Sequence, residues 1–426
     1  MSSPPSRHFQ YEGGELTIDG HSIRALAEEY ETPLYLYSAA AIREAYEAID
    51  RALSFTPHLI AYAVKANGNL AILRLLAELG SGADIVSGGE LARALRAGFS
   101  PDKIVYSGVG KTARELKEAI EVGIRAIHVE SAFELELIEE IARSLGKKAR
   151  VAFRVNPNVD PQTHPYISTG LHSSKFGIPI EEVEALLPRT LGSDHLNLVG
   201  LTMHIGSQLG SPAPLAEAAE LLGRFTVQCI ERGARFESLD IGGGWPLAYG
   251  DEREAYPPPS AFGEAIRSGL EASGVLKYDL LILTEPGRSL VGDAGLLITE
   301  VLGLKSSATK HFVVADAAMT ELIRPALYDA YHAVMPILEP RDRETIVADL
   351  VGPVCESGDF LARDREMPAP RAGELLAIRG AGAYAREMAS TYNARLLAPE
   401  ILIDGTEARL VRKRPSYEAL FENELL

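Results

Sequence analysis

A lysine at the end of an apolar stretch is the residue from which the chemistry of this sequence can first be inferred. Lys65 follows the apolar run from His58 to Val64, whose length and composition are typical of a buried strand. In parallel barrels the carboxyl ends of the strands carry the chemistry, and an amine held there can be desolvated enough to form a Schiff base. A single lysine at a strand end is more often an ordinary solvated charge, so this hypothesis depends on the other strand ends.

Three further apolar runs end abruptly in polar or glycine-rich sequence. They lead into His204-Ile205-Gly206-Ser207-Gln208, Gly242-Gly243-Gly244 and Glu285-Pro286-Gly287-Arg288. Together these segments supply an aromatic ring, a loop whose backbone can approach a ligand closely, an acid and a guanidinium group. Such groups are suited to holding pyridoxal phosphate beside an amine, through ring stacking, phosphate binding by backbone amides and a charge partner for the pyridine nitrogen.

The same segments, together with several other motifs, resemble the fold-type III pyridoxal-phosphate decarboxylases, and within them the branch that acts on diaminopimelate. The resemblance extends from about Thr32 to Asp404. Beyond the strand ends above, its most specific pieces are residues 62–67, 82–90, 164–170, 322–328, 352–359 and 382–384. One such motif alone would be a weak signal, but this many in order are a strong one.

Apolar strand-like runs alternate with amphipathic helical stretches over most of the chain. The expected strands are 34–37, 58–64, 83–86, 104–107, 126–130, 151–156, 197–204, 236–241 and 278–284, and the expected helices are 39–53, 70–79, 89–97, 113–122, 132–145 and 213–232. This alternation predicts parallel βα units, and their number favours a closed (β/α)8 TIM-type barrel over an open sheet.

After Glu285 the sequence changes to short β-like stretches separated by Pro and Gly clusters. We expect strands near 296–301, 311–315, 345–351, 374–378, 400–403 and 408–412, with helical patches near 321–327 and 384–390. They predict a second, mostly antiparallel β domain, in an alanine racemase-like architecture. The expected domains are a barrel at 34–284 and a β domain at 285–426, to which the resemblance adds residues 1–33.

Composition agrees with an enzyme that acts on a small molecule. A chain of 426 residues with 46% hydrophobic residues can bury two cores. Its formal charge of -17 argues against binding to nucleic acid or to an anionic membrane. The two cysteines suggest no disulfide framework, and neither a signal peptide nor a membrane span is evident, so we expect a cytoplasmic protein.

By the resemblance, Lys65 would hold the cofactor covalently, and Glu285 would pair with the pyridine nitrogen and keep it protonated. A protonated ring accepts the electrons that decarboxylation leaves on the α carbon. An arginine in place of Glu285, as in alanine racemases of similar barrel fold, would favour a different outcome. A structural ion pair between Glu285 and Arg288 is the alternative.

The resemblance implies further cofactor contacts around the same strand ends. They are His204, which would stack on the ring, and Ser207, Gly243, Gly244, Gly287, Arg288 and Tyr384. The glycines could instead form only a turn. Asp84 and Arg154 also lie at predicted strand ends and either support the cofactor or form a structural ion pair, and His172 is similarly ambiguous. No metal ligand set is predicted.

Substrate recognition is expected to fall to the second domain. Arg288, Arg324 and Tyr328 offer donors suited to a carboxylate at the far end of a substrate, Glu356 offers a partner for a far ammonium group, and Tyr384 completes the site. Diaminopimelate carries both groups on its distal carbon, whereas ornithine does not. The expected reaction is therefore decarboxylation of meso-2,6-diaminopimelate to L-lysine and carbon dioxide, the last step of lysine biosynthesis.

The resemblance makes Cys355 the proton donor to the α carbon, a role suited to a thiol whose pKa of about 8.5 can be tuned by its neighbours. Cys229 is better explained as a small buried hydrophobe. In the family the loop with Cys355 and Glu356 reaches the partner's active site, which implies a homodimer with shared sites. Two departures from the family pattern are Leu396-Leu397-Ala398 and Trp245.

Three alternatives remain at this stage. An ornithine or arginine decarboxylase would share Lys65, His204, Glu285 and Cys355, so the residues Arg324, Tyr328 and Glu356 distinguish it. A non-catalytic pyridoxal-phosphate-binding protein of the same fold would typically lack the lysine or the donor cysteine, and both are present here. Racemase-like activity is disfavoured by Glu285.

Overall fold

The computed structural model describes residues 7–160, 175–250 and 256–425. The motif at 164–170 and His172 lie outside these residues. The chain divides into two compact units, which are described separately. The barrel unit comprises Ala45–Leu247 and Tyr256–Ser289, and the β unit comprises Met1–Glu44, Ala248–Ala255 and Leu290–Leu426.

Within the described residues of the barrel unit, eight parallel strands hydrogen-bond in a closed ring. In order around the ring they are β5 (His58–Ala63), β6 (Gly82–Ile85), β7 (Ile104–Tyr106), β8 (Ala126–Val129), β9 (Ala149–Asn156), β11 (Leu196–Thr202), β12 (Ser238–Asp240) and β13 (Leu281–Thr284). The short β10 (Ile178–Pro179) pairs with β9 outside the ring. The predicted (β/α)8 barrel is therefore confirmed.

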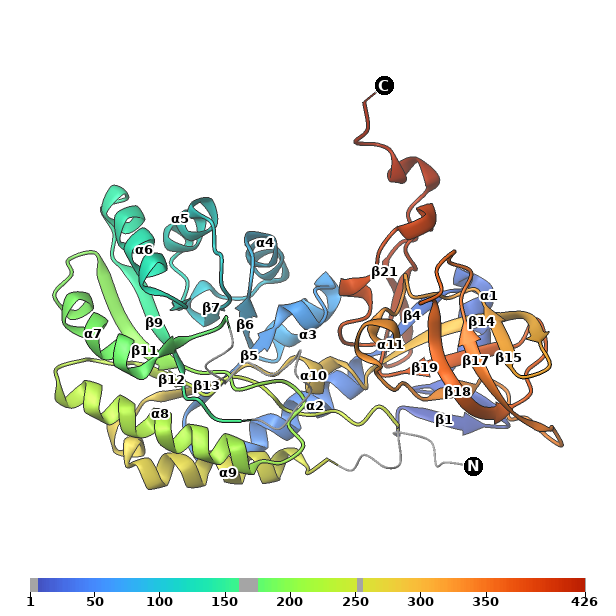
Figure 1. Cartoon of the computed structure of the whole chain (residues 1–426), viewed down its shortest axis with the longest axis horizontal. Helices are drawn as coiled ribbons and strands as arrows, with labels where there is room; N and C mark the ends of the chain where they lie inside the picture. The colour runs from blue at the N-terminus through green and yellow to red at the C-terminus, as the bar shows by residue number, and fades with distance from the viewer. Residues whose placement is uncertain (1–6, 161–174, 251–255, 426) are drawn as a thin grey trace. The chain divides into compact units, whose positions relative to one another are not determined.

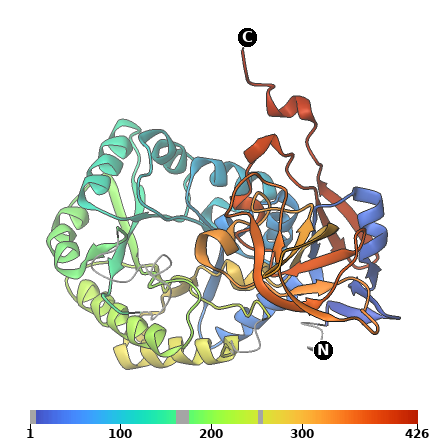
Figure 2. The same cartoon turned by 45° about the vertical axis from the view of Figure 1, so that its right-hand side comes forward.

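Helices form the outer layer of the barrel unit, as the blue-green to yellow ribbons in Figure 2 show. They are α3 (Leu70–Glu78), α4 (Gly88–Ala97), α5 (Ala113–Val122), α6 (Ala132–Ser144), α7 (Ile180–Leu191), α8 (Ala213–Glu231) and α9 (Pro259–Ser273). The side chains of Asn69, Ser87, Thr112 and Ser131 accept backbone hydrogen bonds and begin α3 to α6. These local caps explain why the helix starts could be predicted closely from the sequence.

The interior of the barrel is filled by small and branched apolar side chains. They are Leu59, Ala61, Val105, Ala126, Ala152, Val199 and Leu283. This packed layer is typical of barrels of this type, which are solid cores rather than pores. Polar side chains gather instead at the carboxyl ends of the strands.

The β unit contains a mostly antiparallel sheet, labelled in Figure 1. Its strands are β4 (Leu34–Ser38), β14 (Gly295–Ser306), β15 (His311–Ala315), β16 (Val334–Pro336), β17 (Thr345–Val351), β18 (Phe360–Pro368), β19 (Leu375–Arg379), β20 (Glu400–Asp404) and β21 (Glu407–Arg412). Only β15 with β17 and β4 with β20 pair in parallel within it. The predicted antiparallel β domain is therefore confirmed.

Smaller elements complete the β unit. A three-stranded antiparallel sheet is formed by β1 (Phe9–Glu12), β2 (Glu15–Ile18) and β3 (His21–Ser22), and α1 (Ile23–Tyr30) follows it. The helix α2 (Ala39–Ala52) begins in the β unit and ends in the barrel unit. The short helix α11 (Arg324–Tyr328) belongs to the β unit, and α10 (Arg288–Val291) spans the boundary.

Two predicted elements were wrong, and several observed elements, among them α7, α9, β16 and β18, were not predicted. The run at 34–37 is not a barrel strand, because β4 pairs with β14 and β20 of the other sheet and is buried throughout. The expected helix at 384–390 is only a 3-10 turn, Arg386–Met388. Strand β18 was missed because its charged sequence lacks an apolar run, which suits its place at the sheet edge.

Within the described parts of the chain, we find no helix both long enough and apolar enough to span a lipid bilayer.

Candidate active site

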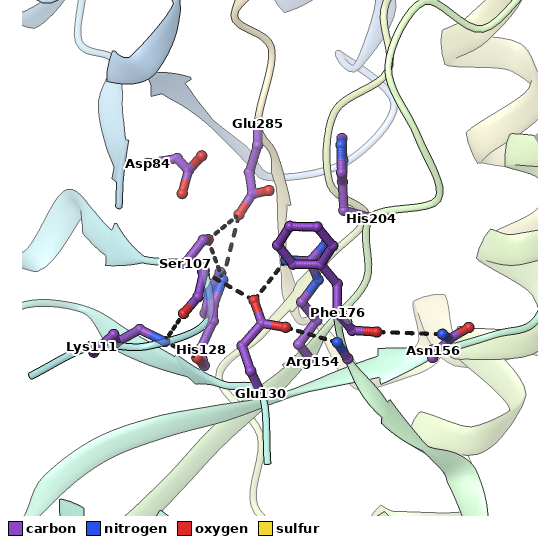
Figure 3. A network of polar contacts seen from close by, with 12 residues as sticks. Asp84, Ser107, Lys111, His128, Glu130, Arg154, Asn156, Phe176, His204 and Glu285 are labelled. Carbon is purple, nitrogen blue, oxygen red and sulfur yellow. Dashed lines mark hydrogen bonds and ion pairs between the residues drawn. The ribbon is translucent and has the colours of Figure 1, made fainter. Parts of the chain in front are cut away.

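Every strand of the barrel contributes a polar side chain at or just after its carboxyl end. These side chains are Lys65 after β5, Asp84 in β6, Ser107 after β7, His128 in β8, Arg154 in β9, His204 after β11, Asp240 in β12 and Glu285 after β13. Figure 3 shows several of them pointing toward one another above the strands. Lys65, Asp84, Arg154, His204 and Glu285 were named from the sequence, whereas Ser107, His128 and Asp240 were not.

Lys65 lies in the single 3-10 turn Val64–Ala66 that follows β5. Its Nζ donates to Asp84 Oδ2 at 2.7 Å, and its side chain is 41% exposed while that of Asp84 is fully buried. The turn is held by Tyr62, whose hydroxyl donates to the carbonyl of Asn67 at 2.9 Å. A partly accessible amine is therefore anchored to the rim of the barrel by a buried carboxylate.

Glu285 is buried beside Ser107 and His128. The Ser107 hydroxyl donates to Glu285 Oε1 at 3.2 Å, and His128 Nδ1 lies 3.4 Å from the same oxygen. Burial and the charges of Asp240 and Asp84 raise the pKa of Glu285 well above its usual value. The alternative partner Arg288 instead donates to Ser207 Oγ at 3.3 Å.

Asp240 and His128 extend this buried cluster. Asp240 Oδ1 accepts the backbone N–H of Gly242 at 2.8 Å, and its Oδ2 lies 3.8 Å from His128 Nε2. Burial, strengthened by the charge of Asp84, raises the pKa of Asp240 to about 7. Burial and the nearby cations, chiefly Lys111, lower the pKa of His128 well below its usual value. His128 and Asp240 are each a polar residue near the end of a predicted strand, and this was the only signal in the sequence. Apolar periodicity alone does not reveal that such residues belong to the site.

Arg154 belongs to a second buried network, drawn in Figure 3. Its Nη1 donates to Glu130 Oε1 at 2.7 Å, and Glu130 Oε2 accepts the backbone N–H of Gly177 at 2.7 Å. Its guanidinium also lies 4.8 Å from the ring centroid of Phe176. Arg154 is thus paired with Glu130, while Asp84 is paired with Lys65, so the two residues do not form an ion pair with each other.

The glycine segment holds His204 in a defined orientation. The backbone N–H of Gly243 donates to His204 Nδ1 at 3.0 Å, and burial near Arg154 and Lys65 lowers the pKa of His204 well below its usual value. The ring is therefore neutral at physiological pH, with its remaining proton on Nε2. The Gly243 amide that sequence reasoning offered to a phosphate is used here to orient the ring.

The loops after β11 and β12 are packed against each other. A Cβ on Gly244, whose φ is +102°, would lie 2.8 Å from the carbonyl oxygen of Gly206, so only glycine fits. Gln208 exchanges two hydrogen bonds with the backbone of Leu247, of 2.6 and 3.1 Å. This packing places Ser207 and Gly244 in adjoining loops, with Arg288 bound to Ser207.

Trp245, the departure next to the glycines, is buried in the barrel unit. Its indole N–H donates to Thr284 Oγ1 at 2.8 Å, and its ring packs against Phe262 at a centroid distance of 5.8 Å. It thereby ties the loop after β12 to the end of β13.

Gly287 lies in the barrel unit between Glu285 and Arg288, and the other remaining predicted residues lie in the β unit. Arg324 is buried at the start of α11, Tyr328 is half-buried at its end, and Tyr384 is half-buried with a φ of +55°. Cys355 and Glu356 are exposed, and the Cys355 backbone N–H donates to Asn393 Oδ1 at 2.7 Å. Residues 396–398, the other departure, lead into β20.

The two cysteines differ as the sequence suggested. Both are free thiols, but Cys229 is fully buried in α8, where burial raises its pKa to about 11, whereas Cys355 is exposed. Only the Cys355 thiol is therefore accessible for proton transfer.

The barrel cluster suits a cationic ligand group. Asp84 Oδ1 and Asp240 Oδ2 are buried, and neither has a hydrogen-bond partner among the residues that the structure describes. Burial and the charge of Asp84 raise the pKa of both Asp240 and Glu285, and Arg154 is already engaged by Glu130. A protonated pyridine nitrogen would relieve this repulsion, so the residues present fit pyridoxal phosphate.

Known proteins can now be compared with this arrangement. Residues 39–292, more than half of the chain, match the family described as "Pyridoxal-dependent decarboxylase, pyridoxal binding domain". The chain belongs to this decarboxylase family. It is a pyridoxal-phosphate enzyme, as the site predicted.

Individual members of the decarboxylase family are similar to this chain over nearly its whole length. Diaminopimelate decarboxylase of Aquifex aeolicus is 46% identical over 98% of this chain and 97% of its own, and that of Pseudomonas aeruginosa is 47% identical over 98% and 99%. The solved diaminopimelate decarboxylase of M. jannaschii in co-complex with L-lysine is 38% identical, with a TM-score of 0.92 over 99% of this chain and 98% of that one. The present decarboxylase therefore falls among the diaminopimelate decarboxylases.

Proposed function

We propose that this protein decarboxylates meso-2,6-diaminopimelate to L-lysine and carbon dioxide, with pyridoxal phosphate as cofactor, as the last step of lysine biosynthesis. The observation that carries the proposal is the presence of Lys65 and Glu285 at the carboxyl ends of two neighbouring strands, β5 and β13. One supplies an amine for covalent attachment, and the other supplies a buried carboxyl for the pyridine nitrogen. The relatives named diaminopimelate decarboxylase support the choice of substrate.

The cofactor is assigned to residues of the barrel rim and one of the β unit. Lys65 binds it covalently, Glu285 keeps a proton on the pyridine nitrogen, and the neutral ring of His204 stacks on its face. The remaining contacts are Ser207, Gly243, Gly244, Gly287, Arg288 and Tyr384. Bound in this way, the cofactor supplies an electron sink that lowers the barrier to loss of carbon dioxide.

The substrate is assigned mainly to the β unit. Arg288, Arg324, Tyr328 and Tyr384 bind the distal carboxylate and orient the substrate, and Glu356 binds the distal ammonium group. Cys355 delivers a proton to the α carbon, so that a C–H bond replaces the C–C bond to the departing carbon dioxide. Asn393 supports this role, because it accepts the Cys355 backbone N–H and so holds the backbone that carries the exposed thiol.

We also propose that the protein is a homodimer whose sites are shared, with Cys355 and Glu356 acting in the partner's site. A cytoplasmic location is proposed because an exposed catalytic thiol suits a reducing compartment.

The substrate assignment is tested by incubating the purified protein and pyridoxal phosphate separately with meso-diaminopimelate, ornithine and arginine. We expect lysine and carbon dioxide from diaminopimelate at a kcat/KM about 100-fold above that for the other two, because arginines left without a carboxylate penalise them. Borohydride reduction followed by peptide mapping should place the cofactor on Lys65. A preference for ornithine, or a label on another residue, would overturn the proposal.

A further inference from the structure

The β unit contains a buried histidine that neither the sequence nor the proposed reaction accounts for. His332 is fully buried, and both of its ring nitrogens are engaged. Nε2 lies 2.8 Å from Arg324 Nη1, and Nδ1 lies 2.7 Å from the carbonyl oxygen of Arg379. Arg324 is the residue to which we assign the distal carboxylate, so its anchoring bears on substrate choice.

The two partners define the protonation of His332. A carbonyl oxygen can only accept, so Nδ1 must carry the proton, and a guanidinium can only donate, so Nε2 must present its lone pair. The ring is therefore a neutral Nδ1–H imidazole that accepts a charge-assisted hydrogen bond from Arg324. Such bonds are shorter and stronger than bonds between neutral groups.

Tyr249 contacts the same guanidinium through the face of its aromatic ring. The Arg324 Cζ lies 4.4 Å from the centroid of the Tyr249 ring, and that ring meets His332 edge-on at 4.8 Å. Tyr249 is only 4% exposed, and a cation against a desolvated aromatic face is more strongly held than one at a wet surface. His332 and Tyr249 are uncharged, so they hold the guanidinium without neutralising its positive charge. A carboxylate partner would neutralise it.

The backbone around this pair is itself fixed. The Ala333 N–H donates to the carbonyl of Tyr249 at 3.0 Å, and the Arg379 N–H donates to the carbonyl of Ala333 at 2.9 Å. Arg379 is further held by Asp293 through two hydrogen bonds of 2.7 and 3.0 Å. A Cβ on Gly380 would lie 2.5 Å from the Tyr249 ring, so glycine is required for this approach.

We propose that His332 and Tyr249 are positioning residues that hold Arg324 for the distal carboxylate and thereby set the preference for a substrate with an amino acid group at each end. This inference rests on the proposed function of Arg324. The helix α11 has only five residues and cannot by itself restrict a long arginine side chain. Because His332 and Tyr249 fix the guanidinium of Arg324 before the substrate arrives, Arg324 loses less side-chain freedom on binding.

The test compares His332→Leu, which removes the acceptor, with His332→Gln, whose amide oxygen can still accept from Arg324. We expect His332→Leu to raise KM for diaminopimelate about 10-fold or more with kcat changed less than about 3-fold, because it removes a hydrogen bond to a charged group. His332→Gln should recover part of the loss. Tyr249→Leu and Tyr249→Phe form a second pair, in which only Phe keeps the aromatic face.

Two inhibitors separate positioning from a general structural role. L-Lysine retains the distal carboxylate of the substrate, whereas 1,5-diaminopentane lacks any carboxylate. Inhibition by lysine should weaken in parallel with KM in the Leu variants, while inhibition by the diamine and the absorbance of the cofactor on Lys65 should stay as in the wild type. Equally weakened inhibition by lysine and by the diamine, or a change confined to thermal stability, would overturn the proposed roles of His332 and Tyr249.

Different results would overturn the proposed function and the proposed roles of His332 and Tyr249. A wild-type protein that makes no lysine from diaminopimelate would overturn the proposed function, and the inference with it. A wild-type protein that makes lysine, with both Leu variants showing unchanged KM, would overturn only the roles of His332 and Tyr249. If His332→Leu does not fold, the Tyr249 pair decides the question by the same measurements.

Discussion

At the scale of single residues, the barrel rim concentrates carboxyl groups where water cannot solvate them. Asp240 is 3% exposed and lies beside the charge of Asp84, while Glu285 is raised in pKa by burial and by Asp240. Such shifts accumulate at functional sites because they prepare groups for a ligand of the opposite charge. The pyridine nitrogen of the cofactor would supply that charge at Glu285.

The pKa of Asp240, about 7, makes a prediction about stability without cofactor. The folded protein holds this proton more tightly than the unfolded chain, so the group favours folding at acidic pH and that contribution is lost as the pH rises through about 7. Asp240→Asn cannot ionise and can still accept the Gly242 N–H. Its stability relative to the wild type should therefore increase between pH 5 and pH 8, by an amount on the order of a few kcal/mol.

Urea unfolding of the cofactor-free proteins at both pH values measures this difference. The exposed Asp194→Asn serves as control and should show no such trend. A constant difference between Asp240→Asn and the wild type across the range would contradict the expectation.

At the scale of elements, two outer helices approach each other through glycines. A Cβ on Gly269 of α9 would lie 2.3 Å from the carbonyl oxygen of Ala216 in α8, and one on Gly223 of α8 would lie 2.2 Å from Ser273 Oγ. A backbone oxygen cannot rotate away as the end of a side chain can. The contact with Ala216 is therefore the more restrictive of the two.

Gly269→Ala should lower the stability of the protein by about 1 to 3 kcal/mol, because overpacking outweighs the helix propensity that alanine adds. Thermal unfolding provides the measurement. Gly210→Ala is the control, since Gly210 is exposed with no atom within 4 Å of an added Cβ, and it should change stability by less than about 0.5 kcal/mol. A stabilised Gly269→Ala protein would show that the helices can separate freely.

At the scale of the whole molecule, the proposed catalytic groups fall in different units. Lys65 and Glu285 belong to the barrel unit, whereas Cys355 and Glu356 belong to the β unit. The proposed sharing of sites between two subunits would account for an exposed thiol on this loop, whose backbone is bound by Asn393. This arrangement can be tested by complementation.

Lys65→Ala and Cys355→Ala proteins should each be nearly inactive, yet regain activity when their subunits exchange. Random exchange of equal amounts makes half of the dimers mixed, each with one intact site, so recovery should approach about a quarter of wild-type activity. Mixing two differently tagged Lys65→Ala proteins is the control for exchange. No recovery after exchange has been verified would exclude sites shared in this way.

Much of this architecture was accessible from local sequence patterns. Alternating apolar runs and helix caps such as Thr112 are local signals, so the barrel and most of its helices could be predicted. Lys65, His204 and Glu285 were recognisable because each interrupts an apolar run abruptly. The loop glycines were recognisable too. Their amides were expected to bind phosphate, but the Gly243 N–H donates to His204 instead.

Only the tertiary structure decided which distant segments meet. Ser107 and Glu285 are 178 residues apart and share a hydrogen bond only because β7 and β13 end at the same rim. In the same way β4 joins β14 and β20, and His332 meets Arg324 and Arg379. An apolar run by itself indicates a buried strand, but the partner of that strand is set by the closure of sheets whose strands are far apart in sequence.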